Sequence, residues 1–408
     1  MLRNLMILAI IFTGLYSCKM DKPKKISLEE DIAFLANDSL AGRETGTPEE
    51  LIAAEYLQKR MQAIGLMPKG NAGTYFQTFT FTPKSDPHAE VQFVTGDSTI
   101  TGTNVVGYID NKAEKTVIIG AHYDHLGMGG QGSLYTEGAA VHNGADDNAS
   151  GVGIMLKLAE SLKDSIKGSN YVFIAFSGEE MGLLGSNYFL KNPTVNLENA
   201  NYMINLDMVG RLREDKTLSI SGVGTAPIWK QVLNATNPGF KLVLGESGIG
   251  PSDHTSFYLQ NIPALHFFTG QHEDYHKPSD DFEKLNYEGM RMIGEYILSL
   301  IAELDDDKKL TFRTTKNESE DVPRFKVALG VMPDYLFDGK GMRIDGVTQG
   351  RPAAAAGLQK GDIVVKLGDS TVVDMMSYMR ALSSFEEGNS AKVVVDRKGE
   401  KVSVEVVF

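Results

Sequence analysis

Hydrophobic positions between residues 116 and 304 follow two alternating periods along the chain. Short continuous apolar runs predict buried strands, and longer runs with one apolar face at helical spacing predict helices. Strands that are apolar throughout and alternate with helices are typical of a mixed, mostly parallel α/β sheet covered by helices on both sides. The expected strands are 116–121, 171–176, 202–206 and 262–267, and the expected helices are 150–163 and 290–304.

An earlier helix is predicted by the residues at its boundaries. Thr47 is a favourable N-cap, Pro48 suits the first turn, and Glu50 stands where its side chain would close a capping box. Apolar residues then recur at helical spacing up to Gly65, which favours the end of the helix.

A charged stretch that is poor in large apolar residues, Asp305–Val322, follows this pattern. Residues 323–408 then show short strand-like runs, several glycine turns and one expected helix near Met375–Leu382, which together predict a small β-rich domain. The predicted organisation is a leader (1–17), a tether (18–27), a main domain (28–304), an exposed linker (305–322) and a C-terminal domain (323–408).

The leader has a charged start and an apolar run, Leu5–Leu15, that is too short to form a stable membrane-spanning helix. It ends in Tyr16-Ser17-Cys18, which resembles the signal of a bacterial lipoprotein, where the cysteine is lipidated and becomes the first mature residue. An ordinary secretory signal with an incidental cysteine is the alternative. We expect an exported protein that is held in a membrane through lipidated Cys18, in the periplasm or at the cell surface.

Composition excludes several classes of function. The 408 residues carry 40 Lys and Arg against 53 Asp and Glu, and this net charge of −13 argues against nucleic acid as a partner, because phosphate recognition needs a basic face. Cys18 is the only cysteine, so an internal disulfide framework and a cysteine-rich zinc site are excluded. The negative charge is concentrated in residues 28–322, which carry −18.

Histidine and acidic residues gather where the predicted strands end and where a predicted helix starts. Because ligands of α/β sheets bind at the carboxyl ends of strands, we expect these residues to converge. Carboxylate and imidazole groups without thiolates suit Zn²⁺, and such a site is hydrolytic by default. The four motifs are His122-Tyr123-Asp124-His125, Asp146-Asp147, Glu179-Glu180 and Asn205-Leu206-Asp207.

These motifs resemble the M28 family of zinc aminopeptidases, and the likeness extends over about residues 28–304, including the early segments 38–43 and 46–47. The resemblance implies a zinc-exopeptidase fold, two zinc ions per chain, and Glu179 as the general base. It implies that Asp146 bridges the two ions and that the peptide bond between Asp146 and Asp147 is cis. The implied metal ligands are His122, Asp146, Glu180, Asp207 and His276, and Asp124 and Asp147 are expected to lie behind them. Asp124 is placed to accept the proton of the His122 nitrogen that faces away from a metal.

The fifth implied ligand lies in Tyr275-His276-Lys277-Pro278-Ser279-Asp280. His266 and His272 are close competitors in the sequence, but the residues that flank His276 match the family motif.

Tyr275 is expected to donate to the oxyanion of the transition state. Some relatives carry a tyrosine three residues before Ser252, where this chain has Ile249, and that departure shifts the expected donor to Tyr275. Arg211, which follows Asp207 closely, receives no role from the motifs.

Residues 323–408 resemble a PDZ domain of the circularly permuted bacterial protease type, through Leu329-Gly330-Val331-Met332 and the run 350–363. In such domains the loop at Leu329, Gly330, Val331 and Met332 offers backbone N–H groups to a peptide carboxylate, and the peptide adds to the sheet as a strand. A spacer that binds nothing is the alternative.

The combined expectation is a lipid-anchored di-zinc aminopeptidase that releases N-terminal residues from peptides with free N-termini, and whose PDZ domain binds a C-terminal peptide. Two alternatives stay open. One is an acyltransferase like glutaminyl cyclase, which would bind one zinc ion. The other is a binding protein that acts through its PDZ domain and whose peptidase fold is not catalytic.

Overall fold

The computed structural model describes residues 26–82, 93, 99–130, 132–306, 308–316, 326–334, 337, 339–348 and 350–408. The expected leader and Cys18 lie outside these residues. Among the helices that are described, none combines the length and the apolar character that a bilayer crossing requires.

The helices and strands of the described residues are as follows. The helices are α1 (Leu28–Leu35), α2 (Pro48–Ile64), α3 (Gly151–Leu162), α4 (Leu184–Lys191), α5 (Trp229–Ala235), α6 (His254–Tyr258), α7 (Tyr287–Glu303), α8 (Pro352–Ala355) and α9 (Met375–Leu382). The strands are β1 (Met67–Pro68), β2 (Phe76–Phe81), β3 (Ile100–Ile109), β4 (Thr116–His122), β5 (Asn170–Phe176), β6 (Ala200–Leu206), β7 (Thr217–Ser221), β8 (Lys241–Leu244), β9 (Ala264–Phe268), β10 (Val331–Pro333), β11 (Met342–Val347), β12 (Ile363–Leu367), β13 (Ser370–Thr371), β14 (Ser390–Arg397) and β15 (Glu400–Val407).

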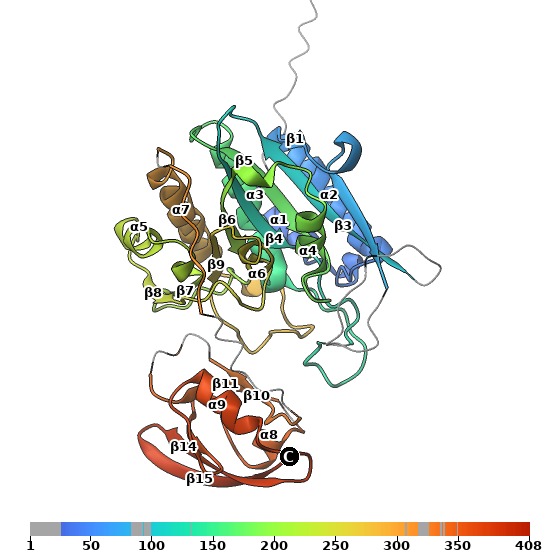
Figure 1. Cartoon of the computed structure of the whole chain (residues 1–408). Coiled ribbons are helices and arrows are strands. Elements are labelled where there is room, and N and C mark those ends of the chain that lie inside the picture. Colours follow the sequence, from blue (N-terminus) through green and yellow to red (C-terminus); the bar gives the residue numbers. More distant parts are fainter. Residues whose placement is uncertain are drawn as a thin grey trace, which may run out of the picture.

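A mixed sheet, with nine strands in the described part of the chain, forms the centre of the main domain (Figure 1). Its order is β1-β3-β5-β4-β6-β9-β7-β8, and β2 pairs with β3. The central strands β5, β4, β6 and β9 run parallel, whereas β3 is antiparallel to β5 and β7 is antiparallel to β9. The predicted strands and helices of this region are present with small shifts at their ends, and the α/β class is confirmed.

Successive side chains of the central strands enter two different cores. Val117 and Ile119 of β4 pack in a large core that also includes residues of α1, α3 and α7. Ile118, between them, packs on the opposite face with Phe189 of α4 and Phe257 of α6. Because both faces of β4 are buried, its residues between Thr116 and His122 are apolar instead of alternating with polar residues.

Helix α2 begins and ends at the predicted residues. The Thr47 hydroxyl accepts the N–H of Glu50 at 3.2 Å, and Gly65 follows the helix with φ 86°. The predicted capping box is wrong, because the Glu50 carboxylate turns into the core and accepts from the Gly46 N–H at 2.7 Å and the Tyr123 hydroxyl at 2.9 Å. Leaving buried donors unpaired would cost more than a capping contact at a helix end contributes.

The C-terminal domain contains a second sheet, with the order β10-β11-β12-β14-β15 and with β13 beside β12. Its core includes Ile344, Val364 and Val393, and the predicted β-rich domain is confirmed. Residues 329–332, which were expected to form one loop, are divided between a turn and strand β10.

Within that segment, the Leu329 side chain is buried in the core and Gly330 adopts φ 77°. Val331 and Met332 belong to β10, which pairs with β11. The expectation of a continuous loop is therefore corrected, because apolar Leu329 and Met332 are more stable in the core than in solvent. Carboxylate binding by this segment stays a prediction.

Part of the expected linker is held against the main domain. In the described stretch 308–316, the Leu310 N–H donates to Asn201 Oδ1 at 2.7 Å, and the Thr315 hydroxyl accepts from the Gly248 N–H at 2.9 Å. Residues 308–316 therefore lie along the main domain.

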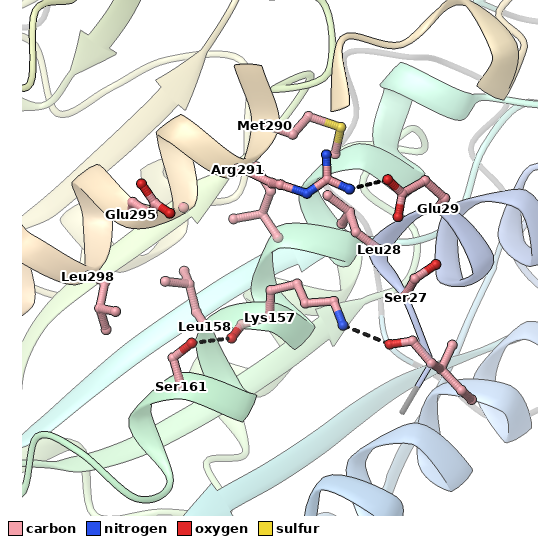
Figure 2. A pocket seen from close by; sticks show the side chains of 13 residues that line it. Ser27, Leu28, Glu29, Lys157, Leu158, Ser161, Met290, Arg291, Glu295 and Leu298 are labelled. Atoms are coloured by element: carbon pink, nitrogen blue, oxygen red, sulfur yellow. Dashed lines mark hydrogen bonds and ion pairs between the residues drawn. The ribbon is translucent and has the colours of Figure 1, made fainter. Parts of the chain in front are cut away.

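A hollow of about 400 Å³ lies between α1, α3 and α7 (Figure 2). Leu28 and Leu158 contribute apolar surface, and Lys157 Nζ donates to the carbonyl of Ile26 at 2.8 Å. An ion pair between Arg291 and Glu29 closes one side. None of the residues that line this hollow belongs to the predicted metal site.

Candidate metal centre

The topology of the sheet brings the candidate residues to one edge. Strands β4, β5 and β6 are parallel neighbours, and the pairing of His122 with Phe176 aligns their carboxyl ends. The side chains come from the end of β4, the turn after β5, the end of β6, the turn before α3 and the loop after β9; they are His122, Glu179 and Glu180, Asp207, Asp147 and His276.

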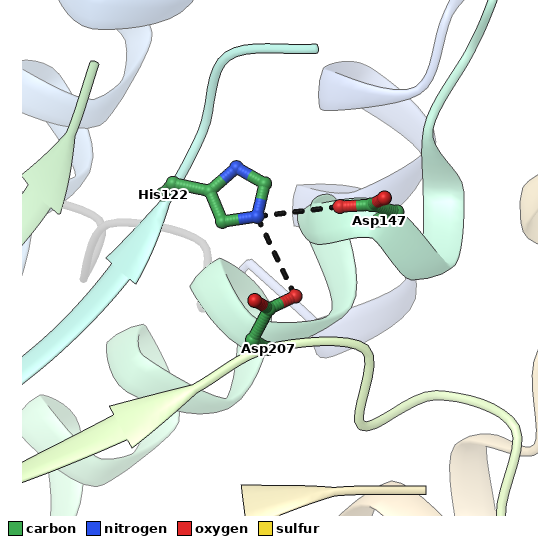
Figure 3. Close-up of side chains that lie close together, drawn as sticks. All are labelled: His122, Asp147 and Asp207. Carbon is green, nitrogen blue, oxygen red and sulfur yellow. Dashed lines mark ion pairs between the residues drawn. The ribbon is translucent and has the colours of Figure 1, made fainter. Parts of the chain in front are cut away.

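His122, Asp147 and Asp207 form the first group of possible metal ligands (Figure 3). His122 Nε2 lies 3.2 Å from Asp147 Oδ1 and 3.4 Å from Asp207 Oδ1. The opposite nitrogen, Nδ1, faces the backbone carbonyl of Asp124 at 3.2 Å, which fixes the ring so that Nε2 points at the two carboxylates.

The second group lies on the other side of Asp147. His276 Nε2 is 3.2 Å from Asp147 Oδ2 and 3.4 Å from Glu180 Oε2. The other ring nitrogen of His276 is 2.8 Å from the carbonyl of Gly132, so a protein acceptor also fixes this imidazole. A second histidine, His125, joins the group through a 2.7 Å contact between its Nδ1 and Glu180 Oε1.

The spacing of these atoms fits zinc. Zinc bonds of about 2.0–2.1 Å in a tetrahedron place the ligand atoms roughly 3.3–3.4 Å from one another. Within the two groups, each histidine Nε2 lies 3.2 Å from an oxygen of Asp147 and 3.4 Å from an oxygen of its second carboxylate, Asp207 or Glu180. Each oxygen of Asp147 faces a different group, so this carboxylate is placed to bridge two ions. The donors are imidazole and carboxylate groups, which zinc accepts.

The expectation for Asp146 is corrected by this geometry. Its carboxylate points away from both groups: Oδ1 accepts the N–H of Gly210 at 2.6 Å and Oδ2 lies 3.1 Å from His272 Nε2. Asp147, expected behind the ligands, lies between the two groups. The cis peptide bond is likewise one position later than expected, between Asp147 and Asn148. The physical reason is that consecutive side chains of this turn point in different directions, so only one of two adjacent aspartates faces the strand ends.

Asp124 supports the site differently from the expectation. Its carboxylate is 3.7 Å from His122 Nδ1, too far for a hydrogen bond, while its backbone carbonyl takes that role. The carboxylate instead accepts the N–H of Glu179 at 3.2 Å and the hydroxyl of Thr45 at 3.0 Å. Asp124 therefore positions the turn that carries the expected general base.

The pKa values of the candidate metal centre are shifted mainly by burial and by the many carboxylates that lie close together there. Burial raises the pKa of Glu179 well above its ordinary value, and Asp207 and Glu180 add to the rise while His122 opposes it. Burial lowers the pKa of His122, but Glu179 and Asp207 outweigh it, and the pKa is raised well above the ordinary value. So many acidic groups in a buried site favour a bound cation.

Tyr275 lies next to the second group. Its ring stacks on that of His276, with 3.8 Å between the ring centroids and 25° between the planes. Burial, followed by the charges of Asp147 and Glu180, raises its pKa well above the ordinary value, so the phenol keeps its proton. The structure places Tyr275 beside a candidate ligand, and its role as an oxyanion donor stays a prediction.

Arg43 is a supporting residue that the motifs did not identify as functional. Its guanidinium is fully buried and donates to the carbonyls of Tyr123, Leu35, Asn143 and Gly144 at 2.5–3.0 Å. Burial lowers the pKa of Arg43 to about 10, against the pull of nearby carboxylates. A single charged group thus ties the loop after β4 to the turn that presents Asp147. The only sequence signal is its place in the segment 38–43.

Residues 104–301 match the sequence profile of peptidase family M28, and residues 310–407 match that of the PDZ domain. Among curated proteins, the chain is 31% identical over 185 residues to the alkaline phosphatase isozyme conversion protein of Escherichia coli, covering 45% of this chain and 51% of that protein. It is 29% identical over 218 residues to aminopeptidase YwaD of Bacillus subtilis, covering 50% and 45%. The chain thus spans about half the length of the curated relatives it matches.

Solved structures share the fold of the main domain. A zinc aminopeptidase from Bacillus subtilis superposes with a TM-score of 0.52 at 19% identity, over 70% of this chain and 98% of that one. A glutaminyl cyclase from Bacteroides thetaiotaomicron, bound to N-acetylhistamine, superposes with a TM-score of 0.54 at 20% identity, over 70% and 99%. These likenesses show that the main domain has the same α/β fold as these two proteins.

Proposed function

We propose that the chain is a zinc-dependent aminopeptidase that removes N-terminal residues from peptides and holds two zinc ions. The observation that carries the proposal is the position of Asp147, whose two oxygens face two separate ligand groups, with His122 and Asp207 on one side and His276 and Glu180 on the other. The match of residues 104–301 to peptidase family M28 supports it.

The roles of the residues follow from their places. When bound, the two ions would lower the pKa of a water molecule and polarise the carbonyl of the scissile bond. Glu179 lies near enough to His122, Asp207 and Glu180 for their charges to act on it, and its half-buried carboxylate is suited to take the proton from water and pass it to the leaving amine. Asp207 and Glu179 supply negative potential for the protonated N-terminus of the peptide. Tyr275 would donate its hydroxyl hydrogen to the oxyanion.

A chain from Lys19 onward, without Cys18, is suited to the test. We expect it to bind two zinc ions and to release p-nitroaniline from Leu- or Ala-p-nitroanilide. Glu179→Gln keeps the shape of the side chain and removes the base, so it is expected to retain zinc and lose activity by at least about a hundredfold. Full activity with full zinc in this variant would refute the proposed role of Glu179.

The same preparation tests the alternatives. A glutaminyl cyclase would bind one zinc ion and cyclise a peptide with N-terminal Gln, and the two ligand groups around Asp147 argue against that stoichiometry. A non-catalytic binder would hydrolyse neither substrate.

We also propose that the protein is exported and anchored through lipidated Cys18, on the basis of the lipoprotein-like sequence at its start. Radiolabelled palmitate should enter the full chain in bacterial cells and should not enter a Cys18→Ala variant. Equal labelling of both would refute the anchor. The PDZ domain is proposed to bind peptide C-termini at the edge strand β10.

A further inference from the structure

A polar hollow of about 220 Å³ lies between the main domain and the C-terminal domain. Arg211, Arg213 and His272 line it from the main domain, and Asp345 and Lys360 line it from the C-terminal domain. Figure 1 shows the C-terminal domain next to the loops that leave the main domain on this side. The hollow thus depends on both domains.

The loops that build the hollow also carry candidate metal ligands. Arg211 follows Asp207 at the end of β6, and His272 precedes His276 in the loop after β9. His272 Nε2 contacts the carboxylate of Asp146, the residue before the bridging aspartate, at 3.1 Å. The hollow and the metal centre therefore share two loops of the main domain.

Two carboxylates of the C-terminal domain, Asp334 and Asp345, are shared by more than two cations from both domains. Arg213 lies 3.3 Å from Asp334 and 3.2 Å from Asp345. Lys360 shares Asp345 at 3.4 Å, and Arg343 shares Asp334. Charge-assisted contacts of arginine with carboxylates are normally about 2.7–2.9 Å. Arg213 is held loosely, and its side chain is 30% exposed, so a further carboxylate can reach it.

On the main-domain side of the hollow, cations again outnumber the carboxylates that pair with them. Arg211 and Lys284 both pair with the single carboxylate of Asp274 at 2.7 Å. Glu273 at the rim offsets one charge. Of the charged residues that line the hollow itself, three are cations (Arg211, Arg213 and Lys360) and two are carboxylates (Glu273 and Asp345), in a chain whose net charge is −13.

We propose that this hollow binds the C-terminal carboxylate of a short peptide whose N-terminus lies at the metal centre. Guanidinium groups recognise carboxylates through paired hydrogen bonds, and two arginines line this site. Because the C-terminal domain forms the far wall, it limits the length of peptide that can make both contacts. The substrate class is therefore short peptides with a free C-terminus. This inference rests on the proposed aminopeptidase function.

The test compares Leu-Gly-Gly and Ala-Gly-Gly with the same peptides as C-terminal amides, on the zinc-loaded chain from Lys19. We expect kcat/KM to be about tenfold higher for the free acids, the worth of one charge-assisted hydrogen bond. Arg213→Ala should reduce the ratio of acid to amide to about one and leave kcat/KM for the amides within about twofold. In this variant Asp334 keeps Arg343 and Asp345 keeps Lys360 as partners.

A binding measurement removes turnover from the comparison. Glu179→Gln should bind Leu-Gly-Gly about tenfold more tightly than its amide by calorimetry, and adding Arg213→Ala should abolish the difference. Lys401→Ala, which removes an exposed cation of β15 paired with Asp396, is the control and should leave all ratios unchanged. Equal hydrolysis and equal binding of acids and amides by the unmodified chain would overturn this inference alone. Hydrolysis of neither would overturn the aminopeptidase function itself.

Discussion

The Nδ1 atom of His125 lies 2.7 Å from Oε1 of Glu180, on a carboxylate whose other oxygen faces His276. Since the carboxylate can only accept when ionised, the imidazole is the donor of this contact. His125 is almost completely buried, and its Nε2 has no hydrogen-bond partner among the described residues. The contact leaves one Glu180 oxygen free to face a metal and holds it there.

His125→Ala should therefore weaken the zinc site at Glu180 and His276 without removing the site at His122. Loss of a partner that orients a ligand typically costs 10–100-fold in metal affinity. Zinc binding by equilibrium dialysis should show one tight ion and a second ion weakened by about that factor. His125→Gln, whose amide can donate to Glu180, should recover part of the affinity. Unchanged affinity for both ions in His125→Ala would contradict the role.

A second prediction concerns the zinc content of variants at the adjacent residues Asp146 and Asp147. Asp147→Asn should lower the zinc content of the dialysed protein to below one ion per chain, because one carboxylate serves both groups. Asp146→Asn should keep two ions, since its carboxylate faces Gly210 and His272 instead. Atomic emission on both variants provides the measurement, and the reverse result would restore Asp146 as the bridge.

Removal of the Arg43 guanidinium should destabilise the fold strongly. Arg43→Met removes the donor to the buried backbone carbonyls of Tyr123, Leu35 and Asn143, while that of Gly144 still accepts the N–H of Ala149. We expect a loss of about 3–5 kcal/mol in the free energy of unfolding. Urea unfolding followed by circular dichroism measures it. The exposed pair of Arg291 with Glu29 is the contrasting case, and Arg291→Ala should cost less than about 1 kcal/mol. Equal losses would show that burial does not decide the effect.

Two stacked histidines predict a dependence of stability on pH. His254 and His266 lie 4.6 Å apart with their rings nearly parallel, and both are buried. Burial, and then the neighbouring histidine, lowers the pKa of His254 well below its ordinary value, and burial also lowers that of His266. The folded state therefore prefers neutral rings. This contribution is complete above the unfolded pKa of about 6.5 and is lost as the pH falls below it.

We expect the urea midpoint of EDTA-treated protein to fall between pH 7.5 and pH 5.5. His254→Phe keeps a ring of similar size without a titratable group, so its midpoint should fall less over the same range. Parallel curves for the two proteins would show that this pair does not contribute.

The local pattern of the chain determined the fold class and most of the elements. Largely apolar runs such as Thr116–Ala121 predicted the central strands, because burial of both faces leaves few polar positions in them. Thr47 and Gly65 marked the ends of α2, because capping depends on neighbouring residues alone. Motifs at strand ends predicted that His122, Glu180 and Asp207 would meet, and the resemblance to peptidase family M28 added His276.

Only the tertiary structure decided in which direction a side chain points and which residues far apart in the sequence come into contact. Adjacent Asp146 and Asp147 are alike as residue types, and only the path of the turn before α3 shows which carboxylate faces both ligand groups. The Glu50 carboxylate accepts a hydrogen bond in the core instead of capping its own helix, because Tyr123, 73 residues away, offers a buried donor. The contacts of Arg213 with Asp334 and Asp345 join residues more than a hundred positions apart, so no local pattern could indicate the hollow between the domains.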